Sequence, residues 1–494
     1  MLLSTKNHRA TPAAAVLAIA LGLVPAVGRA QTWTTLSHPA GFTAGAMLLL
    51  TDGTVMVQDQ GTCGCGGGNW WRLTPDNTGS YLNGSWSQLA TMPSGYKPLY
   101  FASAVLPDGR VIVNGGEYNG SSTGSWTTKG ALYDPAANTW VNVAPPHGWT
   151  TIGDAQSTLL NDGTYMLANC CTTDAVTLNP ATMTWTAVGT GKADINDEEG
   201  WTLLPSGQLL TADANNTADV FHTEIYTNGK WTFAGDSPVL LADIGSGTSN
   251  SHELGPQVLR PDGTVFIAGA TGNTAVYTIK TKKWSAGPAF PKVSGKSLDE
   301  ADGPGSLLPD GNVLLAASPG VFKNGVKFFE FDGTSLNAVP GTPNAAGESS
   351  FQVRLLLLPT GEVLETDGST DVELYKSTGS ANPAWAPVVS KFPAKVKHGQ
   401  SYTVTGKYLN GFSQAVAYGD DYQASTNYPL VRITNTASGH VAFAKTSEFS
   451  SMAVANPKKV TASVLIPAGI EKGASTLEVV ANGIASAPRN VTIK

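Results

Sequence analysis

Short apolar runs alternate with glycine-containing corners along most of this chain. In the stretch 94–116, an apolar run that ends at Leu106 is followed by the corner Pro107-Asp108-Gly109 and then by a second apolar run at 111–113. Aspartate and glycine accept the positive φ that a tight corner needs, so two apolar runs around such a corner predict a β-hairpin.

The same corner recurs seven times. Its positions are 51–53, 107–109, 161–163, 205–207, 261–263, 309–311 and 359–361. A third apolar run usually follows each hairpin, and a Trp comes after the next turn, as with Leu132 and Trp140. Four strands in a repeat of about 50 residues are typical of a propeller blade with the kelch period. The sequence therefore predicts an all-β protein with a seven-bladed kelch-like β-propeller over residues 31–385, whose last blade is completed by the strand near Trp33.

From Lys391 onward the pattern changes to alternating strands of a different kind. They lie at 400–406, 430–434, 460–467, 475–480 and 489–494. Half-buried strands at regular spacing over about 105 residues are typical of a β-sandwich of immunoglobulin type. We therefore predict an immunoglobulin-like C-terminal domain at residues 386–494.

The N-terminus has the pattern of a cleavable signal peptide. Lys6 and Arg9 precede an apolar run at 13–24, and small residues stand at Gly28 and Ala30. A basic start, a short apolar core and small residues at −3 and −1 are the features of such a signal. We assign residues 1–30 to it and expect a secreted, periplasmic or extracellular protein with no membrane span after cleavage. A retained anchor is the alternative.

Charge narrows the range of partners. The chain has 30 Lys and Arg against 37 Asp and Glu, which gives a net charge of −7. A nucleic-acid binder needs basic groups that displace counterions from phosphates, so no nucleic-acid partner is expected. We expect a monomer whose partner is a carbohydrate or another extracellular ligand.

The cysteines form two close pairs. They are Cys63, Cys65, Cys170 and Cys171. Their even number and the exported context favour disulfides, with local bridges and bridges across blades both open. A thiolate metal site is the alternative, but the Cys-x-Cys and Cys-Cys spacings do not match the usual zinc knuckles.

An exported kelch-like propeller followed by a small sandwich resembles the galactose oxidase and glyoxal oxidase family. The resemblance covers essentially the whole mature chain and is strongest at 95–110, 355–361 and 418–432. In that family the propeller mouth holds a copper ion bound by two Tyr and two His, and one Tyr is linked to a Cys to form a radical cofactor. The resemblance thus implies an oxidase of alcohol or aldehyde groups, with the 418–432 loop of the sandwich reaching toward the propeller axis.

One of the five family positions keeps its residue in this chain. Counted from the corners, Tyr100 matches the cross-linked Tyr, whereas the other positions hold Ala44, Phe351, Gln352 and Gln423. Cu(II) prefers imidazole and phenolate donors, Phe offers none, and Ala44 cannot form the thioether. We therefore expect no copper, and Tyr100 is catalytic only if the protein is an oxidase with a divergent metal site.

Carboxylates occupy the equivalent position in four consecutive blades. Residues eight or nine before the corners include Asp154, Glu198, Glu253 and Asp302. Because the inner strands of a propeller converge on one mouth, we expect these side chains to lie close together. Such an oxygen cluster suits a hard cation such as Ca²⁺, or a cationic or polyhydroxylated ligand, and crowded carboxyl groups also transfer protons. Solvated loops, or carboxylates bonded to tight turns, are the structural alternative.

We therefore predict a ligand-binding mouth on the propeller. Its residues are Asp154, Glu198, Glu199, His252, Glu253, Asp302, Gln352 and Gln423. The candidate metal ligands are Asp154, Glu198, Glu253 and Asp302, Ca²⁺ is the candidate ion, and no cofactor is assigned. The favoured function is a secreted module that binds a carbohydrate, cell-surface or protein ligand, and the alternative is an exported oxidoreductase of the galactose/glyoxal oxidase type.

Overall fold

The computed structural model describes residue 1 and residues 31–244 and 250–494. The predicted signal segment, 1–30, lies outside the described residues apart from Met1. Within the described residues, no helix is long and apolar enough to cross a membrane.

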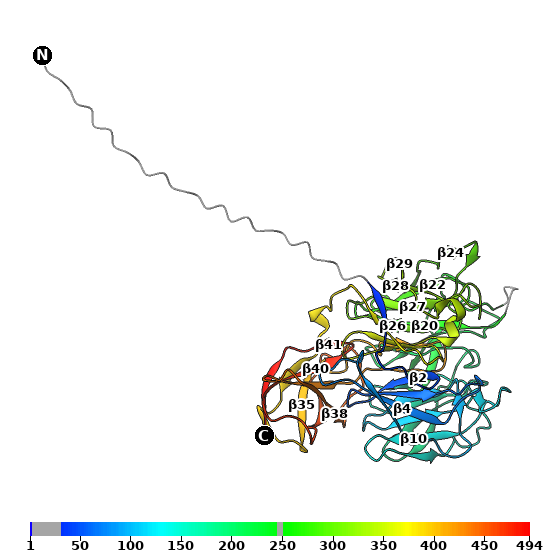
Figure 1. The fold of residues 1–494 in the computed structure, drawn as a ribbon. Helices are drawn as coiled ribbons and strands as arrows, with labels where there is room; N and C mark the ends of the chain where they lie inside the picture. The colour runs from blue at the N-terminus through cyan, green and yellow to red at the C-terminus, as the bar shows by residue number, and fades with distance from the viewer. Residues whose placement is uncertain (2–30, 245–249) are drawn as a thin grey trace.

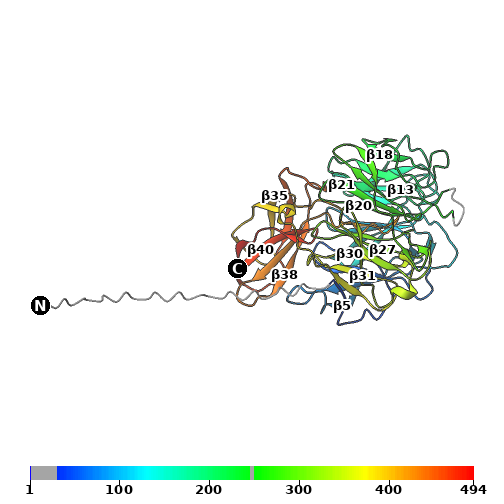
Figure 2. The same cartoon turned by 90° about the horizontal axis from the view of Figure 1, so that it is seen from above.

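Seven antiparallel sheets form a propeller, as predicted, and each contains four blade strands (Figures 1 and 2). The first four blades contain β2 (Ala44–Leu49), β3 (Val55–Asp59), β4 (Asn69–Thr74) and β5 (Ser85–Gln88); β7 (Ala102–Val105), β8 (Val111–Asn114), β10 (Gly130–Asp134) and β11 (Thr139–Val143); β12 (Ser157–Leu159), β13 (Tyr165–Ala168), β14 (Ala175–Asn179) and β15 (Thr184–Val188); and β16 (Thr202–Leu203), β17 (Leu209–Ala212), β18 (Thr223–Thr227) and β19 (Lys230–Phe233).

The other three blades complete the ring. They contain β20 (Leu254–Leu259), β21 (Thr264–Gly269), β22 (Thr274–Thr278) and β23 (Lys283–Ala286); β26 (Gly305–Leu307), β27 (Val313–Ala317), β28 (Lys327–Phe331) and β29 (Leu336–Val339); and β30 (Arg354–Leu357), β31 (Val363–Thr366), β32 (Glu373–Lys376) and β1 (Thr32–Thr35). Short additions are the pairs β6 (Pro98–Leu99) with β9 (Tyr118–Asn119) and β24 (Lys292–Val293) with β25 (Lys296–Ser297), and the 3₁₀ turns η1 (Ala345–Gly347), η2 (Ser350–Gln352) and η3 (Pro383–Trp385).

The seven predicted corners share one geometry. Every corner glycine has a positive φ, between 78° at Gly53 and 91° at Gly311, and donates its N–H to the carbonyl three residues earlier. In each corner the middle side chain accepts the N–H two residues later, at 2.9–3.4 Å. A corner glycine avoids the steric cost that a Cβ would meet at this φ, so the local sequence alone fixes the hairpin.

The predicted closure of the last blade is confirmed. Strand β1 pairs antiparallel with β32, with Trp33 opposite Tyr375, so the N-terminal strand is the outer strand of blade 7. A ring closed in this way joins the first strand of the chain to the last blade and removes an unpaired edge.

Large aromatic side chains pack between the blades. Trp33, for example, contacts Phe328 of blade 6 and Tyr375 of its own blade, each with ring centroids 4.9 Å apart. Its indole N–H donates to the Pro340 carbonyl at 2.6 Å, and that of Trp140 donates to Ala90 of blade 1 at 2.9 Å. These contacts bury apolar surface and bind each blade to its neighbour.

The remaining strands of the chain lie beside the propeller (Figures 1 and 2). They are β33 (Val388–Lys391), β34 (Lys395–Val396), β35 (Ser401–Lys407), β37 (Leu430–Asn435), β38 (Val441–Ser447), β39 (Val460–Leu465), β40 (Gly473–Ala481), β41 (Ile484–Ala485) and β42 (Arg489–Ile493). The path β33-β35-β39-β38-β37-β40-β42-β34 is continuous because β38 pairs with β37 along its first half and with β39 along its second. The all-β prediction for this region is confirmed, while the immunoglobulin-type arrangement and the domain boundaries stay predictions.

One C-terminal segment enters the propeller ring. Strand β36 (Val416–Ala417) pairs with the inner strand β26 of blade 6, and Gln414 exchanges hydrogen bonds with Leu203 of blade 4 and Thr158 of blade 3. The C-terminal strands themselves contact the corner end of the ring, where Thr446 donates to the Thr51 carbonyl at 3.1 Å. The buried segment 413–428 therefore runs along the inner strands, away from the corners.

Candidate functional site

A cavity of about 400 Å³ opens at the end of the ring where the inner strands begin. Its walls carry seven carboxyl groups and four aromatic rings. The residues are Tyr100, Glu117, Tyr118, Asp154, Glu198, Glu253, Asp302, Phe322, Phe351, Asp420 and Asp421. We call it the axial pocket. The four carboxylates that the sequence placed at equivalent positions in four blades all line it.

Four residues of the axial pocket have backbones in the left-handed region. The φ angles are 52° at Tyr100, 60° at Glu198, 48° at Asp302 and 56° at Phe322. This region is costly for a residue with a side chain, at roughly 1–2 kcal/mol each, and such residues concentrate at functional sites. Three of the four lie just before an inner strand, so a strained turn directs each of these side chains into the pocket.

The strain at Glu198 gives a first testable prediction. We expect Glu198→Gly to raise the free energy of unfolding by about 1 kcal/mol, because glycine adopts this φ freely and a half-buried carboxyl group is removed. Glu198→Gln keeps the strained backbone, so it should gain only the part of the stabilisation that comes from removing the carboxyl group. Urea unfolding of the two variants measures the difference, and equal stabilities would show that the turn carries no strain.

The segment 413–428 supplies two further acids of the pocket, Asp420 and Asp421. Tyr422 donates its N–H to the Phe101 carbonyl at 3.2 Å, and its hydroxyl accepts the Tyr100 N–H at 2.9 Å. These bonds hold the end of the segment against blade 2 and bring Asp420 and Asp421 into the pocket. A Cβ at Gly419 would lie 2.5 Å from Asp302 Oδ1, so the chain can pass this carboxylate only with glycine at that position.

Several carboxyl oxygens in the pocket are buried without a partner. Within the described residues, no hydrogen-bond partner is found for Asp154 Oδ1, Glu253 Oε2, Asp302 Oδ1, Asp420 Oδ2 or Asp421 Oδ1. Buried acceptors in native proteins are nearly always satisfied, because an unpaired one retains its full desolvation penalty. Five such oxygens around one cavity indicate a site that a ligand with donors would complete.

Burial raises the pKa of these carboxyl groups. It raises the pKa of Asp302 to about 7, although the Arg354 guanidinium opposes the rise. Burial also raises the pKa values of Asp154, Asp420 and Asp421 well above their usual range, and neighbouring carboxylates add to the effect. Crowded, desolvated carboxyl groups stay protonated or share protons unless a cation offsets their negative charge.

One cation lies behind the pocket. The Arg354 guanidinium is 4.1 Å from the ring centre of Tyr422 and 4.4 Å from that of Tyr418, and it donates to the carbonyls of Phe351 and Val353. It lowers the pKa values of Asp302 and Asp421, which burial raises. A single guanidinium offsets only part of the charge that seven carboxylates would carry.

The cysteines pair locally, Cys63 with Cys65 and Cys170 with Cys171. Each bridge supports a loop beside the pocket. The Cys65 carbonyl accepts the Gly120 N–H at 2.8 Å, next to β9, and Cys170 Sγ packs so closely on Gly153 that a Cβ there would lie 2.4 Å away. The second bridge thus buttresses the turn that carries Asp154.

Four predicted site residues lie away from the lining of the axial pocket. Glu199 bonds to the Lys192 ammonium at 2.8 Å, and His252 Nδ1 contacts Asn215 Oδ1 at 2.6 Å. The Gln352 side chain accepts the Ser349 N–H at 2.9 Å, and the buried Gln423 contacts the Tyr418 carbonyl at 3.4 Å. The structure thus brings the predicted carboxylates of four blades together at the axial pocket, but not Glu199, His252, Gln352 or Gln423.

Sequence reasoning missed four acidic or phenolic residues of the pocket: Glu117, Tyr118, Asp420 and Asp421. The first two follow the inner hairpin of blade 2, where the blade pattern gave no signal. The acid pair stands two and three residues before Gln423, inside the segment already recognised as an axial loop. Two adjacent carboxylates in a loop expected to reach a ring of carboxylates were the available signal.

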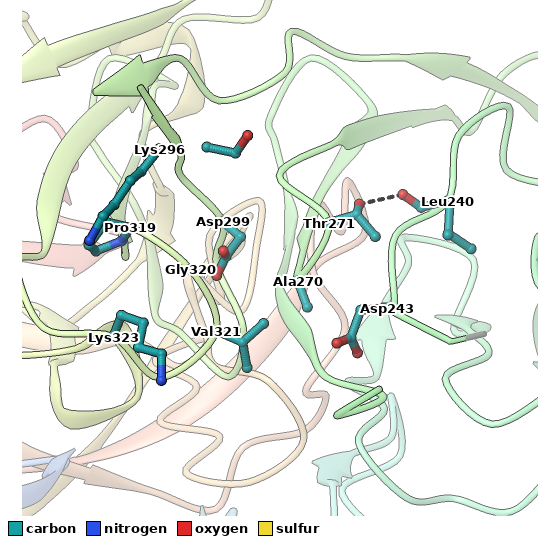
Figure 3. Close-up of a pocket in the computed structure, with 11 residues that line it drawn as sticks. Leu240, Asp243, Ala270, Thr271, Lys296, Asp299, Pro319, Gly320, Val321 and Lys323 are labelled. Carbon is teal, nitrogen blue, oxygen red and sulfur yellow. Dashed lines mark hydrogen bonds between the residues drawn. The ribbon is translucent and has the colours of Figure 1, made fainter. Parts of the chain in front are cut away.

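A second cavity, of about 730 Å³, lies between blades 5 and 6 (Figure 3). Lys296 and Lys323 face it together with Asp243 and Asp299. Burial raises the pKa of Asp299 to about 7. Two positive and two negative side chains line this larger cavity. Its lining therefore has no net excess of negative charge, unlike that of the axial pocket.

No family model and no curated protein matches this chain. Among solved structures it is similar to a fungal alcohol oxidase of the AA5 family in complex with copper, at 13% identity and a TM-score of 0.49, with 95% of this chain and 100% of that chain covered. It is also similar to a catalytically inactive virginiamycin B lyase from Staphylococcus aureus with quinupristin (9% identity, TM-score 0.48, 70% and 99% covered) and to the WD40 propeller domain of Doa1 (10%, 0.44, 70% and 97%). At these identities, function has to be argued from the site.

Proposed function

We propose that this protein is an exported binding protein whose axial pocket captures a small organic cation, with an amine-bearing carbohydrate as the favoured class. The observation that carries the proposal is the set of five buried, unpartnered carboxyl oxygens around one cavity. An ammonium group donates several hydrogen bonds and supplies the positive charge that these acids lack.

The size and the walls of the pocket support a small-molecule ligand. A volume of about 400 Å³ lies within the range of ligand sites. Tyr100, Tyr118, Phe322 and Phe351 line it, and Phe322 and Phe351 meet edge to face with centroids 5.4 Å apart. Aromatic faces attract cations and also pack against sugar rings.

The copper-radical alternative depends on two His ligands and a Tyr-Cys link that the lining does not offer, although Tyr100 and Tyr118 supply phenols. The described residues that line it include no His and no Cys, and Phe351 and Ala44 stand at two of the positions that the oxidase resemblance assigns. Carboxylate oxygens are hard donors, whereas Cu(II) favours imidazole and phenolate. The residues present do not fit the copper centre, so we derive no oxidase chemistry for Tyr100.

We also propose that the protein is exported, that its C-terminal strands form an immunoglobulin-type sandwich, and that its fold is related to the galactose oxidase and glyoxal oxidase family. The axial course of the segment 413–428 supports the resemblance, since it places a C-terminal loop inside the propeller mouth. The two local disulfides support an oxidising compartment. A monomer suffices for this function, because one chain forms the whole pocket.

Calorimetric titration at about pH 8 tests the ligand class, because this pH lies above the pKa of about 7 of Asp302. Glucosamine, chitosan oligosaccharides, choline and spermidine are the cationic probes, with glucose and CaCl₂ as comparisons. We expect amine-bearing probes to bind and glucose not to. Asp421→Asn should weaken binding about 30-fold or more, because losing one partner of a buried charge pair costs about 2 kcal/mol or more.

Asp236→Asn is the matched control, since Asp236 is exposed and lies away from the pocket. It should leave the affinity unchanged. Equal binding of glucosamine and glucose, or an Asp421→Asn variant with wild-type affinity, would contradict the proposal. Tight binding of CaCl₂ that needs Asp302, together with no binding of the amine-bearing probes, would identify the axial pocket as a metal site instead.

A further inference from the structure

A second group of carboxylates lies inside blade 7, away from the axial pocket. Glu365 is on β31 and Glu373 is opposite it on β32, while Asp367 follows β31 and Glu348 lies between η1 and η2. All four are buried, and Glu365 and Glu373 are fully so. One oxygen each from Glu348, Glu365 and Asp367 lies within 4.8 Å of the others.

The cluster has unpartnered oxygens and no cation. No N–H or non-carboxyl hydroxyl donor of the described residues reaches either oxygen of Glu365, Glu348 Oε2 or Glu373 Oε2. The carboxyl groups instead lie within hydrogen-bond distance of one another, Glu365 with Glu373 and Glu348 with Asp367. The polar contacts nearby are the Ser369 N–H on Asp367 at 2.7 Å, the Asn344 side-chain amide on Asp367 at 3.0 Å and the Thr35 hydroxyl on Glu373 at 3.4 Å. In the described chain, no ion pair reaches any of the four carboxylates.

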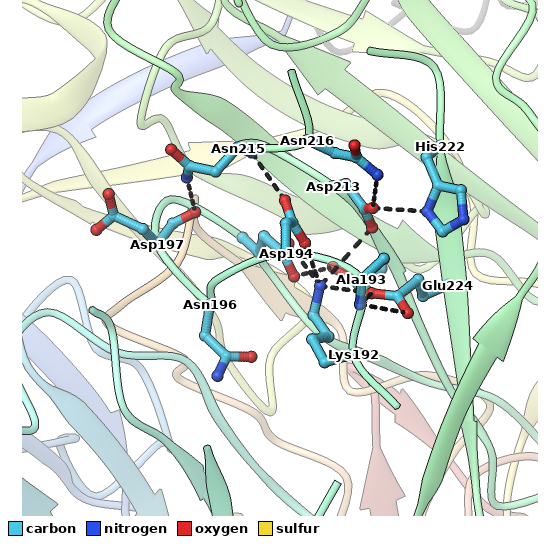
Figure 4. Close-up of polar contacts among 12 residues, drawn as sticks. Lys192, Ala193, Asp194, Asn196, Asp197, Asp213, Asn215, Asn216, His222 and Glu224 are labelled. Atoms are coloured by element: carbon cyan, nitrogen blue, oxygen red, sulfur yellow. Dashed lines mark hydrogen bonds and ion pairs between the residues drawn. The ribbon is translucent and has the colours of Figure 1, made fainter. Parts of the chain in front are cut away.

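Blade 4 has carboxylates at the equivalent positions, and there a lysine neutralises their negative charge. There the Lys192 ammonium lies 2.6 Å from Asp194, 2.6 Å from Glu224 and 2.8 Å from Glu199, with Asp213 at 3.7 Å (Figure 4). The ammonium is buried at the centre of four carboxylates. It serves as an internal cation for the blade.

The two clusters occupy equivalent positions in the repeat. Asp194 and Glu348 stand twelve residues before the middle residue of their corners, and Asp213 and Asp367 stand seven after it. Glu224 and Glu373 are on the third strand of their blades, each opposite the residue five after that corner position. Blade 7 therefore repeats three of the four acids of blade 4, and Glu365 is its fourth. The segment 340–353, which corresponds to the one that carries Lys192, contains no Lys or Arg.

We propose that blade 7 binds a calcium ion between Glu348, Glu365, Asp367 and Glu373, at the place that the Lys192 ammonium fills in blade 4. Calcium takes six to eight oxygen ligands at about 2.3–2.6 Å, so opposite ligand oxygens are up to about 5 Å apart, as in this cluster. Mg²⁺ fits less well, because it keeps several waters and requires near-ideal octahedral geometry, and a buried cage of carboxylates leaves little room for them.

The proposed ion has a structural role in closing the ring. Glu373 is on β32, the strand that pairs with the N-terminal strand β1, and it accepts a hydrogen bond from Thr35 of β1. An ion that binds β31, β32 and the segment before blade 7 would fix the blade on which closure depends. Because calcium would bind the folded state and not the unfolded state, it would stabilise the folded state by mass action.

The test uses the full exported chain. Wild-type protein that has been exposed to millimolar CaCl₂ and then gel-filtered should carry one calcium per chain by mass spectrometry of its metals. EDTA should lower its midpoint of thermal unfolding, and Ca²⁺ should restore the midpoint more effectively than Mg²⁺. Glu365→Gln should weaken calcium binding by more than about tenfold, and Glu348→Gln, at the less buried edge, serves if the first variant folds poorly.

Two control variants separate this site from other carboxylates. Glu362→Gln alters a corner of the same blade, and Asp302→Asn alters the axial pocket; both should keep the calcium and its effect on stability. Wild-type protein without calcium after this treatment would overturn the proposal. So would calcium that is bound equally by Glu365→Gln, or that is lost in Asp302→Asn.

Discussion

Replacing Arg354 by Met should lower the free energy of unfolding by about 3–5 kcal/mol at pH 8, the usual cost of removing one partner from buried charges. Arg354 is the one cation that the described structure places against Asp302 and Asp421, and it lowers the pKa values of both. Without it, these carboxyl groups resist ionisation further. The Met side chain also leaves the Val353 carbonyl without the guanidinium donor, at 3.0 Å in the wild type.

The loss should shrink at pH 5, because protonated carboxyl groups need no countercharge. Urea unfolding at the two pH values measures the difference. Arg432→Met is the matched control: Arg432 pairs with Glu478 at 2.8 Å on partly exposed strands, and such pairs contribute about 1 kcal/mol or less. An Arg354→Met penalty that is the same at both pH values would show that the guanidinium acts through packing and hydrogen bonds alone.

The ligand-free protein should lose stability as the pH rises from about 5 to 8. The pKa of Asp302 is about 7 in the folded state, against about 3.9 for an unfolded Asp. Between these values the folded state binds a proton that the unfolded state has released. The stabilisation is thus complete below pH 4 and disappears as the pH rises through 7, with a slope of about 1.4 kcal/mol per pH unit for each such proton.

Asp302→Asn removes this titrating group. It should make the plot of unfolding free energy against pH less steep, by an amount that corresponds to at most one proton. Unfolding free energies at four or more pH values between 5 and 8, at low salt, measure the slope. Asp236→Asn, on an exposed carboxylate, should leave it unchanged. A bound cationic ligand should raise stability most at the alkaline end, since the ionised pocket binds it best; a profile that rises with pH in the ligand-free protein would contradict the proposed protonation.

Glu198 and Glu199 show where sequence reasoning reached its limit within the site. Both were expected at the mouth because they precede the inner strand of blade 4. The left-handed turn at Glu198 sends this side chain into the axial pocket, while Glu199 turns back to Lys192. Adjacent residues at the start of a strand point in opposite directions, and a strained φ at one of them decides which side chain faces the axis.

Asp420 and Asp421 show a second limit. Their contribution depends on the segment 413–428 running through the ring, where β36 pairs with β26 about 110 residues away in sequence. No local pattern encodes that pairing, so the number of acids in the pocket could not be counted from the blades alone. The unpartnered cluster of blade 7 was equally hidden, because Glu365, Glu373 and Glu348 meet only when two strands and a distant loop pack together.

The sequence by itself determined the repeat. Corner glycines, Asx-type turns and regularly spaced Trp residues act over a few positions, and each has one low-energy local geometry, so seven hairpins and the closing strand near Trp33 followed from composition and spacing. The tertiary structure alone decided the chemistry at the axis and in blade 7. Strained turns and the C-terminal segment inside the ring bring together carboxylates that are far apart in the sequence. Their raised pKa values and unsatisfied oxygens arise only in the folded protein, because folding removes the water that would otherwise solvate them.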